Sequence, residues 1–363
     1  MPQIKIATFN CEWMVSIFGA LWKNWVSPTI PDTFPGKRLG QIDLEPIEDV
    51  PALCERIAGV IRDMDAQIIG IQEGPPRKDQ MEAFVDRFLG GEYLVFQSNE
   101  NWQSIHALVH RSLADQVTAW EPDLPPLKSR WSSIPYYPWG LIGADERKKH
   151  RFDRHPLLLS FKPTDAKELQ VMILHTKSKY SKLKTKEQWE LRDREAVLDA
   201  LTARAKLSAE IYRVRNFLNQ QFEQVADRRK RLPIIVMGDL NDGPYGELIE
   251  QEFLIHNIID ELVGTLLDPL CYFRHAMHPD RLRNTATTRF PDPLQGGQIV
   301  EELIEHILIS PAIWQGRGDF RMKADSCRVE TAVFERHFDD HGPRRKRHLR
   351  PSDHKPVAVM LRY

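Results

Sequence analysis

The segment LPIIVMGDLNDGPYGE, from Leu232 to Glu247, places a carboxylate and a carboxamide directly after an apolar stretch. Asp239 and Asn241 are two residues apart, so in an extended chain both side chains point to the same side. A turn alone explains why Asp, Asn, Gly and Pro occur together here. A functional site explains them equally well, because ligands bind at the carboxyl ends of buried strands. Partners elsewhere in the chain must decide between the two interpretations.

The same combination recurs at other predicted strand boundaries. Each is an apolar run that ends or begins with a carboxylate, a carboxamide or an imidazole, and the residues are Asn10 and Glu12, Glu73, His175, Glu305, and Asp353 with His354. Taken singly, each has a plain structural explanation as a turn residue, a helix cap or a solvated side chain. Taken together they are harder to explain that way, because turn residues need not bring so many oxygen donors beside two histidines.

These side chains form the donor set that a hard divalent cation requires. Mg²⁺ prefers carboxylate and carboxamide oxygens, and water and phosphate complete its shell. Phosphodiester cleavage uses such a metal, a group that orients or deprotonates water, and donors directed at the phosphorus. Zinc hydrolases prefer clusters of His and Cys, which this set does not provide. The sequence therefore predicts metal-assisted phosphoester chemistry, with Mg²⁺ as the cofactor and Mn²⁺ as a substitute.

Strand-like and helix-like segments alternate along the chain and must hold these residues in place. Apolar runs bounded by turn residues predict strands at 4–9, 67–74, 92–97, 104–111, 156–163, 169–175, 232–237, 303–309 and 356–363. Apolar residues at three/four spacing predict helices at 51–66 and 81–90, and one long helix or two abutting helices across 186–231. Residues 13–46 are aromatic and punctuated by Pro and Gly, which indicates a long loop excursion. With no visible linker, we expect one α/β domain over 1–363.

Composition narrows the class of protein further. The 363 residues are 42% hydrophobic and 28% charged, which is typical of a folded chain with a normal core, and the net charge of −1 favours no particular partner. The four cysteines are far apart and form no C-x-x-C pair, so they suggest neither a zinc site nor a disulfide framework. The sequence shows no secretory signal and no apolar run of about 18 residues. We therefore expect a cytoplasmic enzyme.

Six motifs in fixed order resemble a known family. TFNCEW, IIGIQE, ILHTKSK, VMGDLND, IEHILIS and SDHKPV, spread from Thr8 to Val357, resemble the motifs of the endonuclease/exonuclease/phosphatase superfamily, with its deoxyribonuclease I-like and exonuclease III-like fold. Each motif is weak alone, but GDLN and SDH in this order with QE upstream are strong together. The resemblance implies a four-layer α/β/β/α sandwich of two mixed sheets with flanking helices. It also implies a metal-dependent phosphoester hydrolase.

The resemblance assigns part of the set to a metal ion. Glu73, from IIGIQE, matches the principal metal ligand, and Asn10, from TFNCEW, matches a residue beside the metal and the phosphate. Asp353, from SDH, matches a group close to the metal. Glu12 is a further acidic candidate near the metal.

The resemblance assigns the remaining residues to the phosphate and the attacking water. Asp239 matches the residue that orients or deprotonates the water, and Asn241 a donor to the phosphate. His175 and His354 match phosphate contacts, with His175 also a candidate proton donor to the leaving oxygen. One position departs from the pattern: the family usually pairs its last histidine with Asp, and this chain has Glu305 there. The longer side chain must shift the imidazole or the backbone.

Basic runs beside the motifs bear on which phosphoester is cleaved. TKSKYSKLKTK follows His175, GPRRKRHLRP precedes Ser352, and ERKKHR lies at 146–151. Any one run is explained equally well as a solvated face. Beside active-site strands they favour a phosphate-rich polymer, because cationic rims supply most non-specific affinity for nucleic acids. We therefore predict a nuclease acting on DNA or RNA, with substrate contacts from Lys177, Lys179, Arg344, Arg345 and Arg347.

Aromatic residues in predicted loops leave alternatives open. They are Trp13, Trp22, Trp25, Trp131, Tyr136, Tyr137 and Trp139, which could stack on bases, wedge a duplex, enter a membrane interface or fill a second small core. A phosphatase or phospholipase of the same fold, acting on an inositol phosphate, a sphingolipid or another small phosphoester, is the main alternative. A non-catalytic binding protein on this scaffold is a further one, although nearly all the catalytic residue types are present.

Overall fold

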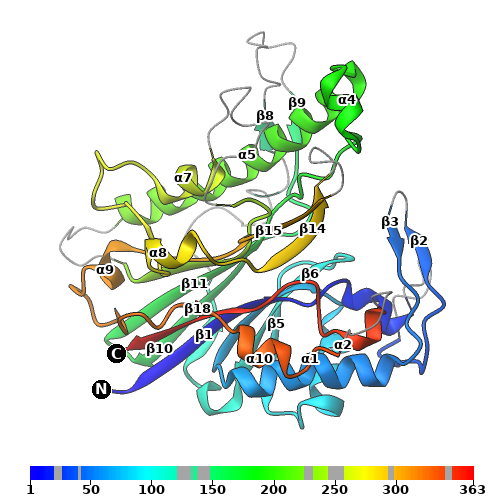
Figure 1. Ribbon diagram of the computed structural model, residues 1–363. Helices are drawn as coiled ribbons and strands as arrows, with labels where there is room; N and C mark the ends of the chain where they lie inside the picture. The colour runs from blue at the N-terminus through cyan, green and yellow to red at the C-terminus, as the bar shows by residue number, and fades with distance from the viewer. Residues whose placement is uncertain are drawn as a thin grey trace.

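The structure is a computed structural model. It describes residues 1–19, 27–39, 42–120, 131, 134–136, 148–224, 232–243, 257–292, 298–339 and 346–363. Two large sheets pack face to face between two layers of helices (Figure 1).

The first sheet joins the two ends of the chain. Its strands lie in the order β17-β19-β1-β4-β6-β5, and β18 also pairs with β19. β1 is parallel to β4 and antiparallel to β19, so the sheet is mixed. The bounds are β1 (Gln3–Asn10), β4 (Ile68–Gly74), β5 (Tyr93–Gln97), β6 (Ser104–His110), β17 (Arg321–Met322), β18 (Arg328–Val329) and β19 (Val357–Arg362).

The second sheet is built from the middle of the chain. Its strands lie in the order β13-β16-β12-β11-β10-β7, with β11 parallel to β12 and the neighbouring pairs antiparallel. The bounds are β7 (Val117–Ala119), β10 (Leu157–Thr164), β11 (Lys167–His175), β12 (Ile234–Asp239), β13 (Arg274–His275) and β16 (Glu305–Ile309).

Alternation along the strands creates the layers. In β1, Ile4 and Ile6 face the second sheet and pack with residues such as Ile173 and Met237, while Ala7 and Phe9 belong to the outer core under the first helical layer. Successive side chains of a strand point to opposite faces, so one strand can serve two cores. Both faces of each sheet are therefore apolar, and the predicted α/β/β/α sandwich of two mixed sheets is confirmed.

Amphipathic helices cover the outer faces. On the first sheet lie α1 (Val50–Met64), α2 (Lys78–Phe88) and the short α10 (Thr331–Glu335), and on the second α5 (Arg194–Glu223) and α7 (Ile258–Val263). Within the predicted helical segment 186–231, the described residues up to 224 form two helices, because α4 (Lys186–Glu190) ends before Asp193 caps the start of α5. Asp193 accepts a hydrogen bond from the amide of Ala196, which stabilises that helix start.

Several short elements complete the chain. The excursion at 13–46 contains the 3₁₀ helix η1 (Met14–Phe18) and a hairpin of β2 (Lys37–Leu39) and β3 (Ile42–Leu44). A further antiparallel pair, β14 (Thr288–Asp292) with β15 (Gln298–Glu302), lies in a region where the sequence analysis predicted no strand. The rest are η2 (Arg111–Leu113), β8 (Ile134–Tyr136), β9 (Lys148–His150), α8 (Pro279–Leu282), α9 (Pro311–Trp314) and η5 (Arg347–Leu349). Among the described helices, none is long and apolar enough to cross a membrane.

Candidate active site

Strand register in the second sheet places three predicted residues in one row. His175 at the end of β11 pairs with Asp239 at the end of β12, and Asp239 pairs with Glu305 at the start of β16. The carboxyl ends of β11 and β12 lie at this edge of the sheet, and the antiparallel β16 begins there. The row therefore follows directly from the pairing.

The first sheet brings its own residues to the same edge. Asn10 ends β1 next to Gln72 of β4, and Glu73 follows at a position where the pairing of β4 with β6 shifts register. Glu73 has a φ of 55°, an uncommon conformation for a residue with a side chain. Asp353 and His354 precede β19, and His354 forms a single bridge with Thr288.

Three side-chain pairs connect the two sheets at this edge. Asn10 Nδ2 donates to Asp239 Oδ2 over 2.9 Å. His175 Nε2 lies 3.9 Å from Glu73 Oε1. His354 Nδ1 is hydrogen-bonded to Glu305 Oε1. Sequence-predicted residues from both ends and the middle of the chain thus come together in one cluster.

Asp239 lies at the centre of the cluster. One carboxylate oxygen accepts from Asn10 and the other accepts from the backbone amide of Asn241, at 2.8 Å. Burial, followed by the neighbouring charge of Glu305, raises the pKa of Asp239 to about 6. Asn241 has a φ of 51°, which turns the chain sharply after the strand, and its Nδ2 donates to the carbonyl of Thr176.

Glu73 is a buried carboxylate whose pKa is raised by its surroundings. Its Oε2 accepts from the amide of Trp13 at 2.8 Å. Burial, Asp353 and Asp239 raise the pKa of Glu73 to about 7 against the opposing effects of His354 and that backbone bond. Several carboxylates near one another in a buried place favour binding of a cation, which would relieve their repulsion.

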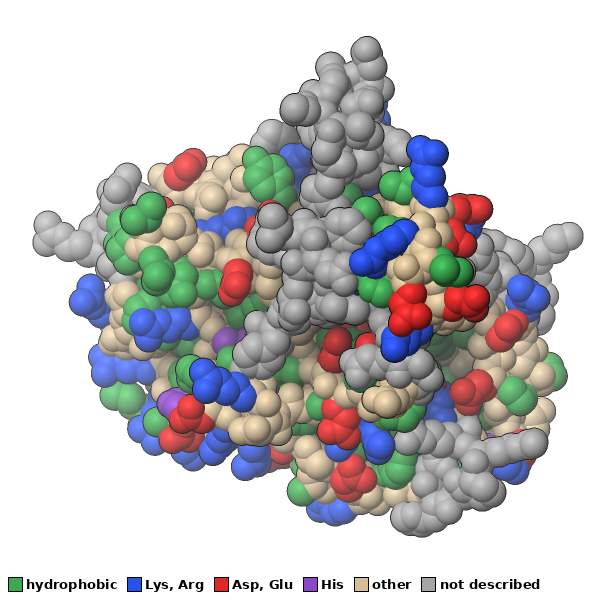
Figure 2. All heavy atoms as spheres, turned by 45° about the horizontal axis from the view of Figure 1, so that its top comes forward, with side chains coloured by type: hydrophobic (Ala, Val, Ile, Leu, Met, Phe, Trp, Pro, Cys, Tyr) green, Lys and Arg blue, Asp and Glu red, His purple; other side chains and the backbone are tan. Residues whose placement is uncertain are grey.

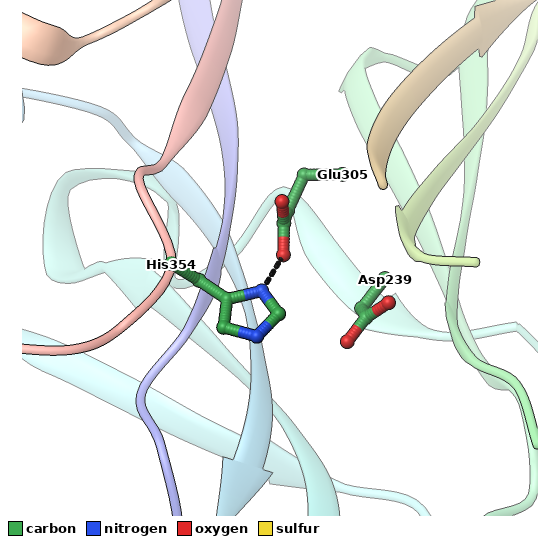
Figure 3. Close-up of side chains that lie close together, drawn as sticks. All are labelled: Asp239, Glu305 and His354. Carbon is green, nitrogen blue, oxygen red and sulfur yellow. Dashed lines mark hydrogen bonds and ion pairs between the residues drawn. The ribbon is translucent and has the colours of Figure 1, made fainter. Parts of the chain in front are cut away.

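His354, Glu305 and Asp239 lie close together at the same edge, and one ligand atom from each lies within 4.8 Å of the others (Figure 3). Burial alone would lower the pKa of His354, but Glu305 and Asp353 hold it well above its usual value. Glu305 is fully buried, and its second oxygen has no hydrogen-bond partner among the described residues. The glutamate that departs from the family pattern therefore still reaches the imidazole.

The pKa of His175 is shifted in the opposite direction to that of His354. Burial, followed by the positive charges of Arg154 and His354, lowers its pKa well below the usual value. Its Nε2 lies 3.6 Å from Asp239 Oδ2, and within the described part of the chain its buried Nδ1 has no hydrogen-bond partner. The cluster thus holds one charged and one neutral imidazole.

Glu12 and Arg347 line the same pocket as Asp353, and arginines pair with the Glu12 carboxylate. The carboxylate of Glu12 is bound by Arg350, with Nη2 to Oε1 at 2.7 Å, and by Arg347 at 3.4 Å, and these arginines outweigh burial and lower its pKa. Arg347 is only 3% exposed and donates to the carbonyls of Cys11 and Glu12 and to that of Arg350. The guanidinium of Arg347 is therefore used inside the fold, although the residue also lines the pocket beside Asp353, and its contact with substrate stays a prediction.

This arginine pair fixes a strained segment. Glu12 and Trp13 have φ values of 47° and 52° directly after β1. Ser352 adds a second connection, since its hydroxyl donates to the carbonyl of Asn10 and accepts from the amide of His354. Sequence reasoning missed Arg350 and Ser352 as site residues, although Ser352 is the first residue of the SDH motif and Arg350 lies two positions before it.

The described lysines after His175 are mostly engaged with partners. Lys179 Nζ lies 2.7 Å from Asp242, Lys182 contacts Glu195, and Lys186 lies 3.3 Å from Glu190. Lys177 is half-buried, and its Nζ donates to the carbonyl of Ser178. On the face shown in Figure 2, acidic and basic side chains are interspersed over much of the described surface, and several basic ones gather at its lower left. Arg344 and Arg345 lie outside the described residues.

Two of the aromatic residues from predicted loops, Trp13 and Trp131, are described, and both pack against a hydrophobic core. Trp131 is 1% exposed and packs edge-on against Phe152, so it fills the core under α5. Trp13 is partly buried against the outer core of the first sheet. Trp22, Trp25, Tyr137 and Trp139, and the side chain of Tyr136, lie outside the described part.

Comparisons with known proteins add little detail. No family model and no curated protein matches the sequence. An endonuclease/exonuclease/phosphatase family protein from Bacteroides thetaiotaomicron is 14% identical, with a TM-score of 0.46 over 99% of this chain and 97% of that chain. The strand order and the layers of this structure establish its architecture without these similarities. The chain has the two-sheet fold that its motifs imply.

Two further solved structures match over similar lengths. A mannosyl-6-phosphatase from Bacteroides thetaiotaomicron is 15% identical, with a TM-score of 0.48 over 99% of this chain and 100% of that chain. A truncated TDP2 from Caenorhabditis elegans is 12% identical, with a TM-score of 0.46 over 99% and 98%. At these identities no substrate and no residue role passes from those proteins to this chain.

Proposed function

We propose that the protein is a divalent-metal-dependent phosphoester hydrolase of the endonuclease/exonuclease/phosphatase type. The observation that carries the proposal is the row of His175, Asp239 and Glu305 from one sheet facing Asn10, Glu73 and His354 from the other. Such a set supplies oxygen donors, a candidate base and a cation within one buried edge.

The donor chemistry fits a hard cation. Glu73 has one oxygen outside its bond to Trp13, and the half-exposed Asp353 lies near enough to raise the pKa of Glu73. With the amide oxygen of Asn10, these residues would hold Mg²⁺ better than the cluster of Asp239, Glu305 and His354, because Glu305 and His354 already bond each other. When bound, the ion polarises phosphoryl oxygens and neutralises charge that develops on them.

The chain's own groups cover the remaining steps. Asp239, with a pKa of about 6, is ionised near neutral pH and can orient water or accept its proton, while Asn10 and Asn241 hold its two oxygens. His354 carries a positive charge, which favours the transition state of phosphoryl transfer over the ground state. His175 is neutral and can donate a hydrogen bond to an oxygen of the substrate.

One experiment tests the proposal directly. The purified protein is incubated with plasmid, single-stranded DNA, RNA, bis(p-nitrophenyl) phosphate and p-nitrophenyl phosphate, each with Mg²⁺, with Mn²⁺ and with EDTA. Hydrolysis of at least one substrate that stops with EDTA and returns with metal supports the proposal. Absence of hydrolysis throughout, or hydrolysis unaffected by EDTA, contradicts it.

The substrate class remains divided between two candidates. A nuclease is the prediction from the basic runs, and Arg344 and Arg345 are the residues on which it now depends. A small phosphoester is favoured by the limited size of the pocket beside Asp353, which is about 180 Å³ in volume and is lined by Glu12, Asp43 and Glu45 together with Arg347.

The same substrate panel separates these candidates. A nuclease gives a higher kcat/KM on a polynucleotide than on the small esters, and its rate falls steeply with salt. A small-phosphoester hydrolase gives the reverse order and little dependence on salt.

A further inference from the structure

Arg154 bridges the two sheets outside the cluster described above. It lies between β9 and β10, and its guanidinium contacts three acceptors. Nε donates to the carbonyl of His175 at 3.1 Å, and Nη2 donates to the carbonyl of Thr176 at 2.6 Å. Nη1 donates to the side-chain oxygen of Gln103 at 2.5 Å, just before β6 of the first sheet.

The segment that carries Arg154 is itself tied to the first sheet. The carbonyl of Asp153 accepts from the side-chain amides of Asn99 and Asn101. The backbone amide of His155 donates to the side-chain oxygen of Asn99 at 2.7 Å. These three bonds hold the backbone on both sides of Arg154, so the guanidinium has a fixed base.

Two residues of the candidate site depend on the carbonyls that Arg154 holds. The imidazole of His175 has no hydrogen-bond partner at Nδ1 within the described part of the chain, so its direction follows from the backbone at the end of β11. The carbonyl of Thr176 accepts from Arg154 and also from Nδ2 of Asn241. One guanidinium thus sets the path of the chain beneath both side chains.

We propose that Arg154 is a positioning residue, which holds the carbonyls of His175 and Thr176 so that the imidazole of His175 faces the carboxylate of Asp239 and the side-chain amide of Asn241 stays bonded to the carbonyl of Thr176. This inference rests on the proposed function. Arginine suits the role because its planar fork reaches three acceptors in different directions, whereas lysine offers a single point charge. A displacement of a catalytic group by about 1 Å costs on the order of 10² in rate, so the effect is measurable.

A double-mutant cycle tests the proposal on whichever small ester the parent hydrolyses with Mg²⁺ or Mn²⁺. We expect Arg154→Met to lower kcat by about 10- to 100-fold with KM within about twofold of the parent. The kcat of Arg154→Lys should lie between that of the parent and that of Arg154→Met. In the His175→Ala background, Arg154→Met should lower kcat by less than about twofold more, because the group it positions is gone. Arg151→Met is the matched control, since Arg151 is exposed and contacts only Asp153 among the described acids.

The outcomes separate the two proposals. Equal losses of kcat in the parent and His175→Ala backgrounds overturn the positioning role, and so does a raised KM with unchanged kcat, which assigns Arg154 to substrate binding. An inactive parent overturns the proposed function and this inference with it. If Arg154→Met does not fold, the cycle is run with Arg154→Lys.

A readout independent of activity accompanies the cycle. Histidine-selective ¹⁵N labelling gives ring signals, and the signal lost in His175→Ala identifies His175. We expect Arg154→Met to shift that signal and to leave the ring signal of the exposed His278 unchanged. An unshifted His175 signal contradicts the proposal.

Discussion

The side-chain amide of Asn10 donates a hydrogen bond of 2.9 Å to Asp239, although 229 positions separate the two residues in the chain. The bond crosses from the first sheet to the second at the edge where both β1 and β12 end. It uses the amide nitrogen of Asn10, and the amide oxygen accepts from the backbone amide of Glu12. Asn10 therefore fixes the carboxylate and also turns the chain that follows β1.

Replacement of Asn10 tests the importance of this bond. We expect Asn10→Ala to lower kcat by roughly 10²-fold, because Asp239 loses the donor that fixes one oxygen. Asn10→Asp should be as severe or worse, since it places a second carboxylate against Asp239. Steady-state kinetics with melting temperatures for both variants provide the measurement. Near-parental kcat in folded Asn10→Ala would remove the bond from the mechanism.

The sequence predicted the residues of the cluster but not the contacts among them. Apolar runs that end in polar side chains are local signals, so Asp239, Glu73 and His175 could be recognised at strand ends from the chain alone. The order of the strands is not a local property. The pairing of β12 with β16, which brings Glu305 beside Asp239, connects segments that are about 70 residues apart, and no pattern in either segment specifies it.

Arg347 shows why the charged residues were harder to predict. A run of arginines and lysines looks the same in sequence whether the side chains face water or the interior. Here Arg347 is buried because the left-handed turn at Glu12 and Trp13 leaves carbonyls that need donors. That need arises from the backbone of a distant segment, so only the folded structure reveals it.

The metal prediction concerns Glu73 and carries a defined pH dependence. The carboxylate must lose its proton to bind a cation, and its pKa is about 7, so Mg²⁺ affinity should rise with pH up to about 7 and then level off. Titration calorimetry at pH 6 and pH 8 measures this. Glu73→Gln should bind Mg²⁺ much more weakly at both pH values, while Glu100→Gln at an exposed position serves as the control. Equal affinity of Glu73→Gln and parent would exclude Glu73 as a ligand.

The same carboxyl predicts how the stability of the metal-free protein changes with pH. Between pH 4.5 and about 7 the folded state keeps a proton on Glu73 that the unfolded state releases, so the free energy of unfolding falls as pH rises through this window. The size is on the order of 1–3 kcal/mol for one group. Urea unfolding in EDTA at pH 5 and pH 7.5 should show this loss in the parent and a smaller loss in Glu73→Gln. Identical pH dependence in both proteins would contradict the assignment.

The pair of Glu305 and His354 predicts a graded loss of activity. We expect His354→Ala to lower kcat by about 10² or more, and Glu305→Gln to lower it less, because the imidazole remains but loses its negative partner. Without that carboxylate the pKa of His354 falls, so the alkaline limb of the pH–rate profile should move to lower pH in Glu305→Gln. His278→Ala, at an exposed position, is the control. An unshifted profile with parental turnover would show that Glu305 does not act through the pKa of His354.

The last prediction distinguishes an arginine that stabilises the fold from arginines that bind the substrate. Arg347→Met leaves the carbonyls of Cys11, Glu12 and Arg350 without a donor, so we expect a loss of stability on the order of 2–4 kcal/mol. Activity should fall by the same factor on every substrate, with no change in salt dependence. If the substrate is a polynucleotide, Arg344→Gln with Arg345→Gln should instead raise KM on DNA or RNA, flatten its salt dependence and spare a small ester. Unfolding curves and salt-dependent kinetics on one polymer and one small ester provide the measurement. If Arg347→Met keeps parental stability and raises KM only on the polymer, Arg347 contacts the substrate after all, and the structural role derived from its buried hydrogen bonds is wrong.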